Sequence, residues 1–347
     1  MFENTERTEL SNLGEFGLIS HLAKHFESKN PSTLLGIGDD AAIVKMGDAY
    51  MAVSTDTFIE GVHFDLMFHP LKHLGYKAVA ATVSDICAMN ALPTQITVAI
   101  GLSNRFSLEA VEELYEGMRL ACEKYGVDLI GGDTSSSRAG LILTLTALGE
   151  VDLNKVTYRK GANANDLLVV TGDVGGAFMG LQILEREKKV FLEHPSMQPD
   201  LETYDYIVGR QLKAEARVDV IKILEDLNIV PTSMMDVSDG IASELFHLGA
   251  ASNVGFDIYE EKLPIDPQTV DTAISFDLNP SIMALNGGED YELLFTIKQA
   301  DWDKIKNNPD FTVIGHATDV VNTYRLNTKA GNTFDIKAQG WQHFSKD

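Results

Sequence analysis

The feature that most constrains the fold is an alternation of short apolar strands with amphipathic helices, which runs through both halves of the chain. In the first half, the pattern predicts a strand at 94–102 and a helix at 107–125 that Ser107 caps. The same order returns in the second half, with a strand at 166–171 and a helix from 177 to about 188. This alternation is typical of mixed α/β domains.

The alternation breaks where polar residues dominate, between about Glu150 and Asn165. This break predicts two domains, an N-terminal domain at 1–155 and a C-terminal domain at 156–347. The other predicted helices lie at 18–26, 70–90, 210–227 and 241–252. The other predicted strands lie at 51–54, 128–130, 141–149, 234–237, 291–297 and 312–314, and a loop is expected at 191–205.

The chain is strongly acidic, since 51 Asp and Glu residues outnumber 28 Lys and Arg residues among 347, for a net charge of −23. Such a chain repels nucleic-acid phosphates and anionic membranes, so neither is a natural partner. No apolar run approaches the roughly 18 residues that span a bilayer, and the first residues do not resemble a secretory signal. Cys87 and Cys122, the two cysteines, cannot form a disulfide framework and indicate a cytoplasmic protein.

Aspartates gather beside Gly, Ser and Thr at the ends of predicted elements. The groups are Asp39 with Asp40, Ser54 with Thr55 and Asp56, Asp85, Asp133, and Asp236 with Ser238 and Asp239. Asp85 stands apart because it lies inside an alanine-rich helix, where a charge must be paired or face a site. Carboxylate and hydroxyl oxygens suit Mg²⁺, and several separate carboxylates indicate more than one ion. The alternative is that each group is an ordinary turn or helix cap.

Two glycine pairs precede acids, at 131–132 and 287–288, where a glycine turn would let the backbone approach a phosphate. The alternative for each pair is an ordinary tight turn. The stretch 36–41 matches the dinucleotide-binding pattern G-x-G-x-x-A, but its two aspartates would repel a pyrophosphate, so we reject that interpretation. The chain has no Gly-Lys dipeptide for a P-loop and lacks the His-Arg-Asp and Asp-Phe-Gly motifs of protein kinases.

An ordered set of motifs runs through nearly the whole chain. Its members are Gly36-Ile37-Gly38-Asp39-Asp40-Ala41, Ser54-Thr55-Asp56-Thr57, Gly61-Val62-His63-Phe64, Gly131-Gly132-Asp133-Thr134, Asp236-Val237-Ser238-Asp239-Gly240, Gly287-Gly288-Glu289-Asp290-Tyr291-Glu292-Leu293 and Gly340-Trp341-Gln342-His343-Phe344. In this order the motifs resemble those of the thiamine-monophosphate kinase family, within the aminoimidazole-ribotide-synthetase superfamily. Two positions depart from the family pattern, because Thr82 stands where Asn is usual and Asn90 stands where Gly is usual.

The resemblance implies two mixed α/β domains, a homodimer formed by the N-terminal domains, and synthesis of thiamine diphosphate from thiamine monophosphate and ATP. It implies that several magnesium ions are held by Asp40, Ser54, Thr55, Asp56, Asp85, Asp133, Asp236 and Asp239. It also implies that ATP is contacted by Gly132, Asp133, Arg159 and Ser238, and the thiamine phosphate by His63, Glu289 and Trp341.

The implied chemistry needs no general base, because the attacking phosphate oxygen is already ionised at neutral pH. Repulsion between two anions is the barrier, and magnesium ions that bridge the phosphates would offset it. Trp341 would stack on a ring of the substrate or, alternatively, anchor the C-terminus in the core.

Two other kinds of function stay open. One is another enzyme of the superfamily, such as a cyclo-ligase or a selenophosphate synthetase, although the latter would need a cysteine before Cys87. A hydrogenase-maturation relative would end in a cysteine-bearing tail, whereas this chain ends Ser345-Lys346-Asp347. The other is a non-catalytic nucleotide- or metal-binding protein, against which the retention of every acidic group argues.

Overall fold

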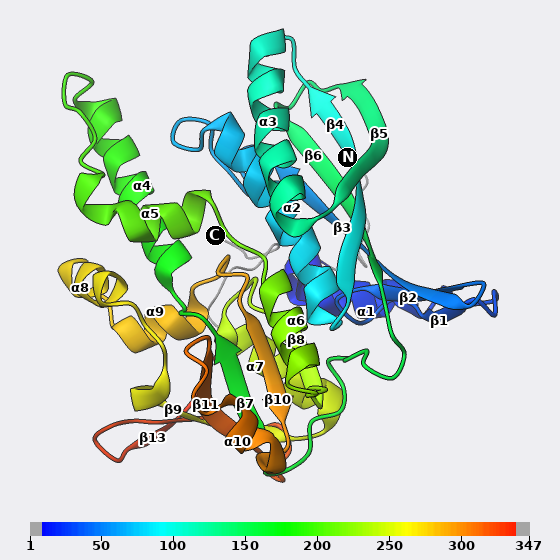
Figure 1. The fold of residues 1–347 in the computed structure, drawn as a ribbon. Helices are drawn as coiled ribbons and strands as arrows, with labels where there is room; N and C mark the ends of the chain where they lie inside the picture. The colour runs from blue at the N-terminus through cyan, green and yellow to red at the C-terminus, as the bar shows by residue number, and fades with distance from the viewer. Residues whose placement is uncertain (1–8, 338–347) are drawn as a thin grey trace.

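The chain folds into two β-sheets with helices packed against them, as the computed structural model of residues 9–337 shows (Figure 1). The first sheet is made from residues 33–150 and the second from residues 167–335. The mixed α/β class that the alternation predicts is therefore confirmed. The two sheets divide within the polar stretch, and the domain boundary at 155 stays a prediction.

The first sheet has six strands in the order β1-β2-β3-β6-β4-β5. They are β1 (Thr33–Leu35), β2 (Ala42–Met46), β3 (Ala49–Ile59), β4 (Leu92–Leu102), β5 (Asp128–Ser136) and β6 (Ile142–Glu150). The pairing is antiparallel except between β4 and β5. Helix α1 (Gly14–Ala23) precedes the sheet, and α2 (Leu71–Ala88) and α3 (Leu108–Tyr125) lie side by side over it (Figure 1).

The buried position of α2 depends on small residues that let it approach its neighbours. A Cβ atom on Gly75 would lie 2.0 Å from the carbonyl oxygen of Leu114 in α3, and one on Gly117 would lie 1.8 Å from that of Lys72. Alanine and glycine at this crossing therefore allow close helix packing. Helix α2 also contacts strand β8 of the second sheet, so it carries Asp85 into the region where the two halves meet.

The second sheet has seven strands in the order β13-β12-β9-β11-β7-β10-β8. They are β7 (Leu167–Thr171), β8 (Ser233–Asp236), β9 (Gly255–Tyr259), β10 (Leu293–Ile297), β11 (Phe311–Thr318), β12 (Tyr324–Asn327) and β13 (Thr333–Asp335). The helices of this half are α4 (Gly176–Glu193), α5 (Asp205–Leu212), α6 (Val218–Asp226), α7 (Ile241–Ser252), α8 (Pro267–Ser275), α9 (Pro280–Asn286) and α10 (Trp302–Ile305). Within residues 9–337, no helix combines the length and the apolar character needed to cross a membrane.

The helices expected at 70–90, 107–125 and 241–252 are confirmed, and Ser107 caps α3 by accepting a hydrogen bond from the amide of Ala110. The single helix expected at 210–227 is wrong, because α5 ends at Leu212 and α6 begins at Val218. Glu215 lies in the break and accepts hydrogen bonds of 2.7 Å from the hydroxyls of Tyr76 and Tyr125. These long-range contacts outweigh the local helical periodicity.

Strand β5 also differs from expectation. It runs to Ser136, so Gly131 and Gly132 lie within a strand and not in a phosphate-binding turn. A Cβ atom on Gly132 would lie 1.8 Å from the carbonyl oxygen of Val98 on β4, which explains the glycine by close strand packing. All nine residues of β5 are exposed, and the strand forms the edge of its sheet.

Candidate active site

A cavity of about 1700 Å³ is lined by residues from both halves of the chain. From the first half come the loop between β1 and β2, strand β3 and the last turn of α2. From the second half come the end of β8 and the turn after it, the later part of α7, one face of α4 and the loop before β10. The cavity thus collects segments that lie far apart in the sequence.

Three aspartates meet in this cavity. Asp40, Asp85 and Asp236 each offer a carboxylate oxygen, and these oxygens lie within 4.8 Å of one another. Ser54 donates a hydrogen bond to Asp85, and Ser84 Oγ donates one to Asp236 Oδ2 at 2.8 Å. The cluster is therefore held by hydroxyls from both strand β3 and helix α2.

Asp85 and Asp236 of the cluster, and Asp56 beside it, are costly to ionise. Burial raises the pKa of Asp236 to about 7, and the charge of Asp40 adds to the rise. Burial, followed by the charges of Asp56, Asp236 and Asp40, raises the pKa of Asp85 well above its usual range. Burial also raises the pKa of Asp56 to about 6, opposed by a hydrogen bond to Thr82. A cation placed among these groups would offset their mutual repulsion.

The positively charged side chain of Arg159 lies beside the cluster. Its Nη2 atom lies 2.6 Å from Asp40 Oδ1, and its side chain is mostly buried. The guanidinium lies over the ring of Phe16, which in turn packs against His247 with the ring centroids 3.8 Å apart. Asp39 accepts a hydrogen bond from the Arg159 amide, and burial, with the charge of Asp40, raises the pKa of Asp39 to about 6.

Glu289 occupies another part of the cavity. Lys77 Nζ lies 2.8 Å from Glu289 Oε1, and Gln211 Nε2 donates to Glu289 Oε2 at 2.8 Å. Ser238 O accepts a hydrogen bond from the Glu289 amide at 2.7 Å. His63 lines the same cavity, and its Nδ1 atom accepts a hydrogen bond from the Ile59 amide.

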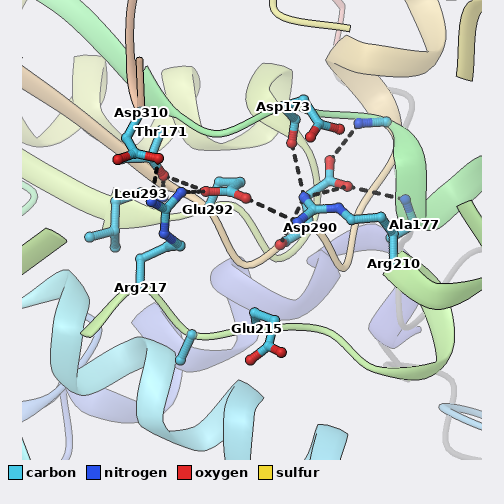
Figure 2. A network of polar contacts seen from close by, with 12 residues as sticks. Thr171, Asp173, Ala177, Arg210, Glu215, Arg217, Asp290, Glu292, Leu293 and Asp310 are labelled. Atoms are coloured by element: carbon cyan, nitrogen blue, oxygen red, sulfur yellow. Dashed lines mark hydrogen bonds and ion pairs between the residues drawn. The ribbon is translucent and has the colours of Figure 1, made fainter. Parts of the chain in front are cut away.

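A buried ionic network fixes the segment that follows Glu289 (Figure 2). Glu292 accepts from Arg210 Nη1 at 3.0 Å and from Arg217 Nη1 at 2.6 Å. Asp290 accepts from the amide of Gly175 at 2.6 Å, at the start of α4. Glu289 and Tyr291 adopt φ angles of 66° and 51°, in a backbone region that residues other than glycine rarely adopt. The network therefore supports a locally strained backbone at the cavity.

The structure brings together most of the residues that the sequence singles out. The cavity is lined by Asp40, Ser54, Thr55, Asp56, His63, Asp85, Arg159, Asp236, Ser238, Asp239 and Glu289. The Thr55 hydroxyl, however, pairs with Thr146 at 2.9 Å on the exposed side of β3. Gly132 and Asp133 lie on the exposed strand β5 and do not line the cavity of their own chain. Trp341 lies outside the described residues.

Sequence reasoning missed Ser84, Lys77 and Gln211. Lys77 could have been found, because it is a charged residue in the same apolar helix that made Asp85 conspicuous. Ser84 and Gln211 carried no comparable signal, since both are neutral and their partners lie 152 and 78 residues away in the sequence.

The two departures from the family pattern have local explanations. Thr82 is buried beside Asp56, where it supplies a hydroxyl in place of an amide. Asn90 has a φ angle of 54°, in the left-handed region that Gly and Asn favour. Its side chain donates a hydrogen bond of 2.7 Å to the Lys155 carbonyl. Asn can therefore replace Gly at this helix end.

The chain is similar in sequence and fold to the AIR-synthase-related proteins. The sequence model of the AIR synthase related protein, N-terminal domain, matches residues 38–151. These residues span strands β2 to β6 and carry Asp40 and Asp85. The hydrogenase maturation protein HypE in complex with ATP has a similar fold, with a TM-score of 0.68 and 18% identity over 97% of this chain and 99% of that one. The fold is thus that of the AIR-synthase-related proteins.

More similar proteins define the family. The thiamine-monophosphate kinase of Bacillus subtilis is 31% identical over 96% of this chain and 100% of its own length. That of Escherichia coli is 33% identical over 96% and 98%, respectively. The solved structure of AaThiL complexed with AMPPCP and TMP has a TM-score of 0.82 and 31% identity, and covers 98% of this chain and 100% of that one. The chain belongs to the thiamine-monophosphate kinase family.

Proposed function

We propose that the protein transfers the terminal phosphoryl group of ATP to thiamine monophosphate and so forms thiamine diphosphate. Full-length similarity to thiamine-monophosphate kinases and to AaThiL complexed with AMPPCP and TMP supports this activity. The observation that carries it is the meeting of Asp40, Asp85 and Asp236 within 4.8 Å, in a cavity that Arg159 and Glu289 also line.

The residues at this cluster fit magnesium. All the donors are carboxylate or hydroxyl oxygens, and buried Asp40 Oδ2 has no hydrogen-bond partner among residues 9–337. Asp40, Asp85 and Asp236 would hold the ions, and the further candidates are Ser54, Thr55, Asp56, Asp133 and Asp239. When bound, magnesium supplies the positive charge that offsets repulsion between the donor and acceptor phosphates.

The chain's own residues bind and orient the two substrates. Arg159, held by Asp40, presents its guanidinium to the ATP phosphates, with Ser238 and Gly132 as further contacts. His63 and Glu289 contact the thiamine phosphate, and Trp341 is a further proposed contact. The acceptor oxygen is ionised at neutral pH, so alignment of the two phosphates replaces proton removal.

A homodimer is part of the proposal. On the exposed edge strand β5, Leu129 and Ile130 are 42% and 59% exposed. A second copy of the chain would cover this edge. It would also give Asp133 and Gly132 a route to an active site that they do not reach in their own chain. Both cysteines are free thiols, which supports a cytoplasmic location.

Product identification tests the activity. The purified protein, incubated with ATP, Mg²⁺ and thiamine monophosphate, should form thiamine diphosphate, and Asp85→Asn should form almost none while it stays folded. A protein that binds ATP but yields no diphosphate would instead be a non-catalytic member of the fold. Turnover that persists in Asp85→Asn would contradict the assigned site.

A further inference from the structure

Besides Asp40 Oδ2, two buried polar atoms on the cavity wall have no hydrogen-bond partner within residues 9–337. They are Gln211 Oε1 and His69 Nε2. Gln211 is 3% exposed and His69 is 2% exposed. Buried polar atoms are nearly always hydrogen-bonded in native proteins. These two therefore point to a ligand that supplies the missing partners.

The orientation of the Gln211 amide follows from Glu289. A carboxylate only accepts hydrogen bonds, so the amide nitrogen must face it, and Nε2 lies 2.8 Å from Glu289 Oε2. The other carboxylate oxygen, Oε1, is held by Lys77 at 2.8 Å, and the Lys77 side chain is 2% exposed. Both oxygens of Glu289 are thus engaged, and the Gln211 carbonyl oxygen is left as an acceptor.

His69 presents a second acceptor on the wall of the same cavity. Burial lowers the pKa of His69 to about 3, and the charges of Lys77 and His73 add to the shift, so the ring is neutral at physiological pH. A hydrogen bond to the main chain of Leu212 engages the ring and opposes the shift. Leu212 follows Gln211 in α5, so the main chain that engages the His69 ring adjoins Gln211, and both side chains line the same cavity. A neutral imidazole with one nitrogen engaged as a donor has the other as an acceptor.

An apolar wall accompanies the acceptor pair. Phe68, Phe178 and Met283 line the same cavity and pack against one cluster, which includes Leu212 of α5. A flat ring with an amino group would lay its face on these side chains and donate its N–H bonds to the two acceptors. The pyrimidine ring of thiamine has this chemistry, since it carries one exocyclic amino group.

We propose that Gln211 and His69 recognise the amino group of the substrate's pyrimidine ring and so determine specificity for the acceptor. This inference rests on the proposed function. The adenine of ATP also carries an amino group, but two observations favour the pyrimidine. Gln211 is bonded to Glu289, a residue assigned to the thiamine phosphate. Arg159, assigned to ATP, instead groups with Phe16 and His247.

The test compares substrates that differ at the amino group. The full-length protein is assayed with thiamine monophosphate and with oxythiamine monophosphate, in which oxygen replaces the amino group. Wild type should prefer thiamine monophosphate by at least about tenfold in kcat/KM, because oxygen would face two acceptors. Gln211→Met keeps the side-chain length but removes the acceptor, and it should narrow the preference by about tenfold. His69→Phe should narrow it in the same direction.

The controls separate this recognition from folding, from ATP binding and from the activity itself. Gln182 lies on the neighbouring helix α4 but does not line the cavity described above, so Gln182→Met should leave the preference for thiamine monophosphate unchanged. Calorimetric binding of both monophosphates extends the comparison to any variant with low turnover. Equal losses for both monophosphates, or an unchanged preference, would overturn the proposal. The proposal would also be overturned if the Gln211 or His69 variant lost more kcat/KM with ATP than with inosine triphosphate. If wild type forms no thiamine diphosphate at all, the proposed function fails first.

Discussion

Ser84 Oγ donates a hydrogen bond to Asp236 Oδ2 at 2.8 Å, and this contact joins helix α2 of the first half to strand β8 of the second. Ser84 is fully buried and directly precedes Asp85. The spacing between Asp85 and Asp236 is therefore set by a bond between the halves, and not by either half alone.

Ser84→Ala should weaken the metal site without dismantling it. The lost hydrogen bond to a carboxylate should cost about 1.5–3 kcal/mol of stability. The half-saturating magnesium concentration for turnover should rise several-fold, because Asp236 loses the donor that orients it. Magnesium titrations of activity measure this effect. Ser275→Ala, which removes a similar hydroxyl bond in α8, serves as the control, and an equal shift there would contradict the role of Ser84.

The charge of Asp85 should destabilise the metal-free protein although turnover requires it. Burial and three neighbouring carboxylates raise its pKa, so its charged form is unfavourable in the metal-free protein. Asp85→Asn should raise the melting temperature in a chelator while abolishing turnover, and magnesium should stabilise wild type far more than the variant. Thermal unfolding with and without magnesium measures both effects. A variant that is less stable than wild type in the chelator would show that the charge is compensated within the chain.

His69 should make stability depend on pH. Its pKa is about 3 in the folded chain, below the usual value of 6.5, so the unfolded chain binds its proton first as pH falls. The contribution of neutral His69 to the free energy of unfolding is fully present above pH 6.5. It is lost as the pH falls towards 3, at up to about 1.4 kcal/mol per pH unit. The free energy of unfolding of His69→Gln, relative to that of wild type, should thus be higher at pH 5 than at pH 7.5 in urea unfolding. His25→Gln, at an exposed histidine, is the control, and an equal effect of His69→Gln at both pH values would contradict the prediction.

Asp133 should serve the active site of a partner subunit. Its strand β5 is exposed and does not line the cavity of its own chain. Asp85→Asn and Asp133→Asn homodimers should each be inactive. In a mixed dimer, one site would contain both substitutions and the other would contain neither, so co-expression should restore activity. No recovery in purified mixed dimers would place Asp133 in its own chain's site or outside catalysis.

The sequence was most informative where local chemistry and long-range packing agree. The apolar periodicity of 70–90 predicts α2, and a charge within it marks Asp85 as a site residue. At 131–132 the prediction of a turn was wrong, because both residues lie in strand β5, where Gly132 packs closely against the carbonyl of Val98 on the neighbouring strand. The break between α5 and α6 likewise depends on Tyr76 and Tyr125, which lie some 90 to 139 residues from Glu215. Contacts of this kind are set by tertiary packing and leave no local pattern.

Nucleotide binding measured with and without magnesium tests whether the acidic cavity binds phosphate through metal ions. Calorimetry should show that wild type binds ATP in magnesium and loses most of that affinity in a chelator. Asp85→Asn should bind weakly in both conditions, because the cluster of Asp40, Asp85 and Asp236 has lost one carboxylate. Equal ATP affinity for wild type with and without magnesium would show that protein cations such as Arg159 neutralise the phosphates. Metal ions would then have no part in holding the phosphates in this cavity.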